Sequence, residues 1–166
     1  MYWRKIIFLS VLMLFTITWF LHFYPKQETM PNQNGEQWQF LDELSIKYGS
    51  GKSSLIHNYT PIYEKHISHM RHEPISLLEI GVFQGSSVMM WENYFTAADI
   101  HFIDLTDKHL IYNYTKSKIH LLDQSNQTQL EKFAKEIGRK FDVIIDDGGH
   151  KMEEQITTFK VFYPHF

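Results

Sequence analysis

The sequence contains no cysteine, and this absence excludes several kinds of site. A chain without cysteine can form no disulfide, no thiolate nucleophile and no cysteine-based zinc centre. A lumenal domain with a sufficient core does not need disulfides. Cysteine usage therefore leaves the compartment of this protein open.

An excess of positive charge is also missing. The 16 lysines and arginines are outnumbered by 19 aspartates and glutamates, which gives a formal net charge of -3 and a pI of about 6.3. Proteins that bind nucleic acids usually present a basic field. We therefore expect no nucleic-acid partner. The 166 residues, of which 43% are hydrophobic, allow one packed domain plus an appendage.

Two phosphate-binding fingerprints are absent as well. A P-loop needs a glycine five residues before Gly51, where Ile46 stands, so we interpret residues 51–53 as a polar loop between two helices. The dinucleotide pattern G-x-G-x-x-G fails at its second glycine, which is replaced by Phe83. This replacement argues against a nicotinamide-dependent dehydrogenase.

The N-terminal run 6–24 contains no charged residue. Nineteen residues give roughly 28 Å of helix, close to the hydrocarbon thickness of a bilayer. We therefore predict a transmembrane signal anchor over residues 1–24. Arg4 and Lys5 outweigh Lys26 near this run, which predicts a cytoplasmic N-terminus and a lumenal or extracytoplasmic domain. A cleaved signal peptide, which would give a secreted protein, is the alternative.

The remainder divides into a linker and one domain. Residues 25–36 are polar and include two prolines and a glycine, which predicts a flexible stalk. Residues 37–166 show the hydrophobic patterns of a folded domain. Apolar spacing predicts two helices, over 38–48 and 59–70. Strands then alternate with helices, with strands expected at 77–80, 100–103, 119–122 and 141–145 and helices at 86–95, 127–137 and from 152 onward. This alternation predicts an α/β fold with a parallel sheet and helices on both faces.

Carboxylates follow or end successive predicted strands. In an open parallel sheet, ligands bind beyond the carboxyl ends of the strands. Glu79 begins a glycine turn, and Asp104 lies 25 residues later at the end of the next strand, where a carboxylate can accept both hydroxyl hydrogens of a ribose. Asp123 is placed to reach an adenine ring. Any one of these aspartates could instead be a helix cap, but their repetition favours a nucleoside-type ligand.

Several motifs together resemble one family. They are KYG at 47–49 followed by Lys52, HNYTPIYE at 57–64, LEIGV at 78–82, GSS at 85–87 followed by MW at 90–91, DQS at 123–125 and FDVIIDDGGH at 141–150. They are similar to the macrocin and mycinamicin O-methyltransferases, which are class I enzymes dependent on S-adenosylmethionine. The resemblance covers about residues 40–166. It implies a Rossmann-like methyltransferase sheet and methylation of a sugar or glycan hydroxyl with S-adenosyl-L-methionine and Mg²⁺.

The resemblance also assigns site residues. The expected cofactor-binding residues are Thr60, Glu79, Gly81, Gly85, Asp104, Asp123 and Gln124. Asp147 is expected to bind the metal, and His150 is expected to be the general base. These residue types suit the reaction, because magnesium on hard oxygen ligands acidifies a hydroxyl and an imidazole can accept its proton.

One departure from the family pattern bears on these expectations. The family continues after residues 162–164 with another strand, whose acidic residues complete the metal site. We therefore expect a truncated half-sheet of four strands with an exposed edge and an incomplete magnesium site. A fragmentary gene model, a degenerate gene and completion by another chain, including a second copy, stay open. The alternative function is a catalytically inactive module that binds the cofactor or a partner.

Overall fold

The computed structural model of the chain describes residues 7–10 and 37–163. Their strands all run parallel in one sheet of order β1-β5-β2-β3-β4. The strands are β1 (Ile7–Ser10), β2 (Ser76–Ile80), β3 (Asp99–Asp104), β4 (Lys118–Leu121) and β5 (Val143–Asp146). The helices are α2 (Gln37–Lys47), α3 (Thr60–Ile67), the 3₁₀ helix η1 (Ser68–Met70), α4 (Ser86–Tyr94), α5 (Gln127–Ile137) and α6 (Met152–Phe162).

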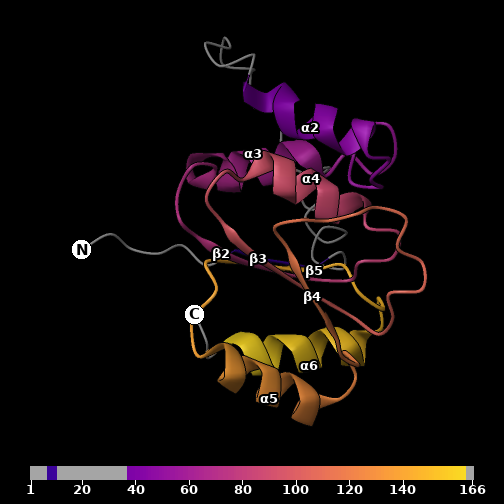
Figure 1. The fold of residues 1–166 in the computed structure, drawn as a ribbon, viewed down its shortest axis with the longest axis vertical. Helices are drawn as coiled ribbons and strands as arrows, with labels where there is room; N and C mark the ends of the chain where they lie inside the picture. Colours follow the sequence, from indigo (N-terminus) through magenta and orange to yellow (C-terminus); the bar gives the residue numbers. More distant parts are fainter. Residues whose placement is uncertain (1–6, 11–36, 164–166) are drawn as a thin grey trace, which may run out of the picture.

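Helices cover both faces of the sheet. Helices α2, α3 and α4 lie on one face and α5 and α6 on the other (Figure 1). Successive side chains of a strand point to opposite faces. In β2, accordingly, Leu77 belongs to the core beneath α4, whereas Leu78 belongs to the core beneath α5 and α6. All five residues of β2 are buried, as expected for a central strand. The predicted α/β sheet with helices on both faces is therefore confirmed.

The predicted elements within 37–163 are confirmed with shifts of one or a few residues at their ends. The helix expected over 59–70 consists of α3 followed by η1, and Pro61 lies in its first turn, where a missing N–H costs little. Helix α5 begins after Asn126, whose side chain accepts a hydrogen bond from the Gln129 N–H. It ends at Gly138, which has the left-handed conformation typical of a C-terminal cap.

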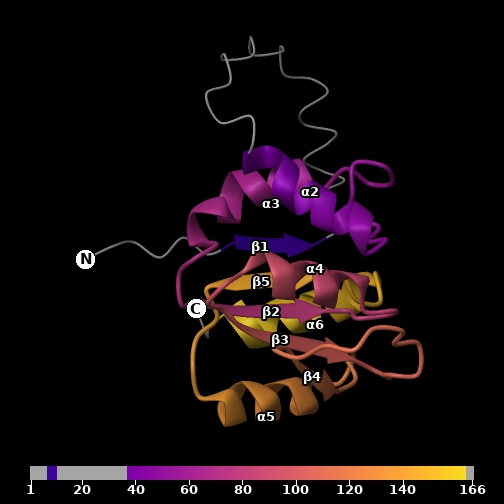
Figure 2. The same ribbon diagram turned by 45° about the horizontal axis from the view of Figure 1, so that its top comes forward.

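The N-terminal residues differ from the prediction. Ile7–Ser10 form β1, which pairs in parallel with β5 (Figure 2), with Ile7 opposite Val143 and Ser10 opposite Asp146. The helix expected over 1–24 is therefore wrong for residues 7–10. The physical reason is that β5 would otherwise present unpaired backbone groups along one edge, which a short extended segment can satisfy. The four strands expected are β2–β5, and β1 covers the edge that we expected to be exposed.

The rest of the anchor and stalk predictions falls on residues 1–6 and 11–36, which lie outside the described residues. Among the helices within 7–10 and 37–163, none has both the length and the apolar character needed to cross a membrane.

Candidate functional site

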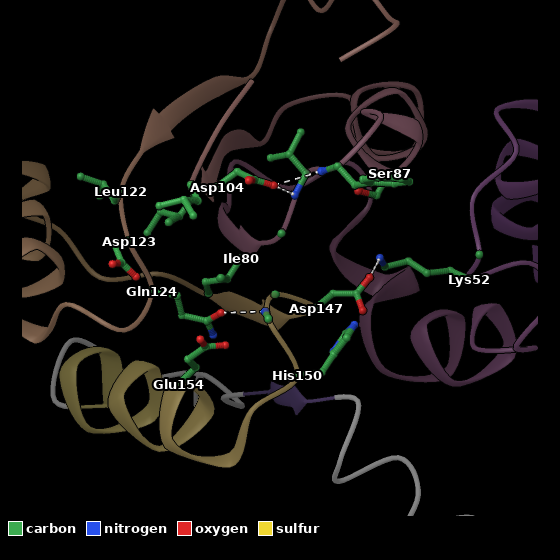
Figure 3. A pocket seen from close by; sticks show the side chains of 18 of the residues that line it. Lys52, Ile80, Ser87, Asp104, Leu122, Asp123, Gln124, Asp147, His150 and Glu154 are labelled. Carbon is green, nitrogen blue, oxygen red and sulfur yellow. Dashed lines mark hydrogen bonds and ion pairs between the residues drawn. The ribbon is translucent and has the colours of Figure 1, made fainter. Parts of the chain in front are cut away.

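A cleft of about 560 Å³ opens at the carboxyl ends of β2, β3, β4 and β5. This is the edge at which parallel α/β sheets bind ligands. Figure 3 shows Asp104 and Asp123 on one side of the cleft and Lys52, Asp147 and His150 on the other. Six of the predicted site residues line it: Gly81, Asp104, Asp123, Gln124, Asp147 and His150.

The floor of the cleft depends on the turn at Gly81. Its φ of +96° is a conformation that favours glycine, and a Cβ there would collide with the main-chain carbonyl of Asp147. The turns that follow β2 and β5 therefore touch through their backbones. This close approach places the two strand ends against one ligand-sized space.

The carboxylate of Asp104 holds this turn in place. Its Oδ2 accepts hydrogen bonds from the N–H groups of Val82 at 2.7 Å and Phe83 at 3.0 Å (Figure 3). Its Oδ1 accepts one from the Thr106 N–H at 3.1 Å. Because a carboxylate has about four acceptor positions, these contacts still leave capacity for the hydroxyls of a ribose.

Gln124 lines the cleft and connects the turn after β5, β5 itself and α6. Its Oε1 accepts a hydrogen bond from the Gly149 N–H at 3.0 Å, whereas its Nε2 donates to Asp146 at 2.9 Å and to Thr158 at 3.0 Å. Burial raises the pKa of Asp146, although the hydrogen bond from Gln124 opposes this shift. Gln124 therefore orders the turn that carries Asp147 and His150.

Asp123 lies on the side of the cleft opposite Asp147, in a small turn (Figure 3). Its Oδ1 accepts hydrogen bonds from both the N–H and the hydroxyl of Ser125, at 2.8 and 2.7 Å. These two bonds lower the pKa of Asp123. The side chain is therefore an ionised acceptor at neutral pH, as recognition of an amino group would require.

Three predicted cofactor residues lie behind the wall rather than on it. Thr60 is fully buried and donates its hydroxyl hydrogen to Asp42 at 2.6 Å. Glu79 is also fully buried, and it accepts a hydrogen bond from the Trp91 indole N–H. Gly85 has a φ of +85° at the start of α4, where a Cβ would lie 2.9 Å from Leu110. In this structure all three support the cleft, and their contact with a cofactor stays a prediction.

Lys52 is the functional candidate that sequence reasoning missed. Its Nζ lies 3.0 Å from Glu79 Oε1 and forms an ion pair with Asp147 Oδ2 (Figure 3). Burial disfavours the ammonium, but the two carboxylates outweigh this effect and raise the pKa of Lys52. The residue was correctly assigned to a loop between helices, α2 and α3. Its match to the family motifs was the one sequence signal for function, and no role was assigned to it.

Other cleft residues were also missed. His57 and Tyr59 reach the wall from the same loop, and their rings stack at a centroid distance of 5.4 Å. Phe83 lines the cleft with 65% of its surface exposed and a φ of 49°, unusual for a residue other than glycine. Their places in the cleft follow from how the loops fold over the strand ends, which local hydrophobic patterns do not reveal.

The magnesium site is incomplete within the described residues. Asp147 supplies one hard oxygen ligand at the cleft, which is the donor type that Mg²⁺ prefers. Across residues 7–10 and 37–163, no group of three or more histidines, cysteines or carboxylates could hold a metal ion. Since Mg²⁺ requires near-octahedral coordination, this part of the chain supplies one ligand and not a complete site.

Comparison with known proteins identifies relatives, although no family model matches the chain. A tetracenomycin-C rhamnosyl 3'-O-methyltransferase from Streptomyces olivaceus is 35% identical over 133 residues, which are 75% of this chain and 33% of the relative. Mycinamicin VI 2''-O-methyltransferase from Micromonospora griseorubida is 33% identical, and demethylmacrocin O-methyltransferase from Streptomyces fradiae is 32% identical.

The fold agrees with these matches. MycE methyltransferase of the mycinamycin biosynthetic pathway, solved with Mg, SAH and mycinamycin VI, superposes with a TM-score of 0.69 and 32% identity. The match covers 75% of this chain and 36% of that structure. The chain thus spans about a third of the length of the curated relatives it matches. Over this matched region, the chain belongs to the macrocin- and mycinamicin-type O-methyltransferases.

Proposed function

We propose that this chain forms the S-adenosylmethionine-binding part of an O-methyltransferase that acts on a sugar or glycan hydroxyl. The observation that carries this proposal is the convergence of Gly81, Asp104, Asp123 and Asp147 on one cleft from four strand ends. A close glycine turn beside separated carboxylates suits a nucleoside that bears a positively charged sulfonium. The relatives named above are sugar or macrolide O-methyltransferases, which supports the acceptor class.

The cleft residues divide the chemistry between them. Asp104 would accept the ribose hydroxyl hydrogens, and Asp123 would accept from the adenine amino group. Methyl transfer breaks the S–CH₃ bond as the acceptor oxygen forms a new O–CH₃ bond. His150 lines the same cleft and would take the proton that the hydroxyl releases. The cleft would hold the acceptor oxygen, the methyl carbon and the sulfonium sulfur in line, which is the main requirement of such a displacement, with the base beside the acceptor hydroxyl.

Magnesium belongs to the proposal with one named ligand. When bound, the ion would acidify the acceptor hydroxyl and orient it. Asp147 would contribute one carboxylate oxygen. The remaining ligands would come from outside the described residues, either from this polypeptide or from a completing chain, and a second copy of the chain is one candidate for that role.

Cofactor binding tests the proposal directly. Isothermal titration of the full chain with S-adenosylmethionine should give measurable binding. Asp104→Asn should weaken it roughly tenfold or more, because a charged hydrogen-bond acceptor is lost. Asp107→Asn is the matched control, since Asp107 is exposed and outside the cleft wall. Absence of heat at millimolar ligand would exclude a cofactor-binding function.

Catalysis is tested separately through His150. Its φ of 58° is one that asparagine adopts readily, so His150→Asn should keep the turn while removing the base. We expect the rate of methyl transfer to fall roughly 10²- to 10⁴-fold with little change in cofactor affinity. Transfer would be measured with labelled cofactor, magnesium and candidate glycans.

The second candidate function is a cofactor-binding module without catalysis. It is favoured by the single metal ligand found within the described residues. Binding of S-adenosylmethionine with no transfer to any tested glycan, even with magnesium and at concentrations that permit self-association, would support it. Sedimentation of the chain alone would establish whether a second copy is present.

Membrane attachment through the N-terminal run is a further part of the proposal. The uncharged segment 6–24 supports an anchor with the domain outside the cytosol in a state in which residues 7–10 leave β1, with secretion after cleavage as the alternative. Residues 7–10 cannot be in β1 and in a membrane helix at once, and residues 11–24 alone are short for a full span. Extraction at alkaline pH tests this: retention in the pellet supports an anchor, and release into the supernatant contradicts it.

A further inference from the structure

Lys52 occupies a position that the proposed reaction does not use. Its side chain is 6% exposed and lies between the buried carboxylate of Glu79 and the cleft-facing carboxylate of Asp147, whose side chain is 29% exposed. Of these two acids, only Asp147 lines the cleft. The ammonium therefore lies on the inner side of Asp147, the carboxylate that is proposed to bind the metal ion.

The backbone around Lys52 holds it in this place. Its carbonyl accepts hydrogen bonds from the N–H groups of Tyr59 at 2.9 Å and Thr60 at 3.2 Å. Its own N–H donates to the Ser50 hydroxyl at 3.3 Å. These bonds tie the backbone of Lys52 to the start of α3, so the fold directs its side chain toward Glu79 and Asp147.

The local charges have opposite effects on a divalent cation. Glu79, Asp147 and Lys52 together carry one net negative charge when all are ionised, which leaves the cluster mildly attractive to cations. The Lys52 ammonium, however, binds the same Oδ2 atom that a metal could use and repels a second positive charge nearby. Glu79 cannot compensate as a ligand, because it is fully buried behind the wall.

We infer that Lys52 is an internal counter-cation that competes with the divalent ion for Asp147, so that metal binding requires the ammonium to leave this carboxylate. The inference rests on the proposed function. Lys52 thus acts as a positioning residue: it holds Asp147 when no metal is present. The loop that carries it also supplies His57 and Tyr59 to the cleft wall, so its displacement would also move this part of the wall.

Binding of Mn²⁺ to the full chain tests the inference, with free Mn²⁺ measured by electron paramagnetic resonance. Mn²⁺ prefers the same oxygen ligands as Mg²⁺. The Lys52→Met/Glu79→Gln double variant removes the ammonium without leaving an unpaired buried carboxylate, and its reference is Glu79→Gln alone. We expect the double variant to bind Mn²⁺ about tenfold more tightly or better than this reference. Adding Asp147→Asn should abolish the gain.

If Lys52 has only a structural role, the Mn²⁺ titration gives a different result. Loss of packing would weaken or leave unchanged the affinity for Mn²⁺, and either outcome for the double variant would overturn the inference. Lys52→Arg keeps the charge and should show no gain. Lys118→Met removes an exposed lysine that pairs with Asp99, and it should also leave Mn²⁺ affinity unchanged. Titration of each variant with S-adenosylmethionine reports separately on the cofactor site, so failure of the proposed function is distinguishable.

Discussion

Gly81 lies where β2 turns into the cleft, and its backbone conformation is incompatible with a side chain for two independent reasons. The positive φ disfavours any residue with a Cβ, and the carbonyl of Asp147 occupies the space that a Cβ would need. Gly138, at the end of α5, has a similar φ of +61°, but a Cβ there would lie 3.7 Å from the Lys135 carbonyl oxygen, an ordinary van der Waals contact. Comparison of Gly81 with Gly138 therefore distinguishes the effect of conformational strain from the effect of a steric collision.

Substitution by alanine should therefore affect these glycines unequally. Gly138→Ala should lower the free energy of unfolding by about 1–2 kcal/mol, through the left-handed conformation alone. Gly81→Ala should cost more than this and should also eliminate cofactor binding, because the turns after β2 and β5 must separate. Urea denaturation and cofactor titration check both results. Equal losses of stability would contradict the close approach at Gly81.

Among the elements, β5 connects the edge strand β1 to the candidate site. It lies between β1 and β2, and the turn after it carries Asp147 and His150. The register of β1 on β5 places Ser10 opposite Asp146, immediately before that turn. An added edge strand therefore supports the side of the cleft that bears the proposed metal ligand and base.

Removal of residues 1–10 should expose one edge of β5. We expect faster hydrogen exchange at those β5 amides that pair with β1, since their hydrogen bonds would face solvent. The amides of β3, which lies between β2 and β4, should be unaffected and serve as the internal control. Exchange followed by mass spectrometry measures both. Unchanged exchange in β5 would mean that β1 does not pair with it in solution.

For the molecule as a whole, a histidine pair couples stability to pH. His101 in β3 and His120 in β4 lie side by side: Nδ1 of His101 and Nε2 of His120 are 3.1 Å apart, and the two rings stack on each other. Burial lowers the pKa of both, although Asp99 opposes this shift at His101. Lys118 and Arg139 also face this cluster, through their ion pairs with Asp99. The folded protein therefore keeps these histidines neutral.

Acidification should weaken the fold through this pair. Because the unfolded histidines take up protons at a higher pH than the folded ones, stability is lost as the pH falls through about 6.5. We expect the free energy of unfolding to decrease from pH 7.5 to 5.5, and to decrease less in a His101→Phe/His120→Phe variant. Chemical denaturation at both pH values provides the measurement. An equal decrease in the variant would assign the effect to other groups.

The local sequence determined the helices and strands of the domain and the positions at which the strands end beside the cleft. Apolar alternation and helical spacing act over short distances, so β2–β5 and α2–α6 could be predicted within a few residues. The cleft positions of Asp104, Asp123 and Asp147 also followed, because the carboxyl ends of parallel strands share one edge.

Tertiary structure alone decided which of these residues meet and which support them. Lys52 pairs with Asp147 across 95 residues of chain, and Ile7–Ser10 pair with β5 instead of continuing a helix. Both outcomes depend on non-local satisfaction of charge and backbone hydrogen bonds, which no sequence window contains. For the same reason, the sequence could not show that Glu79, a predicted cofactor residue, is fully buried and pairs with Lys52.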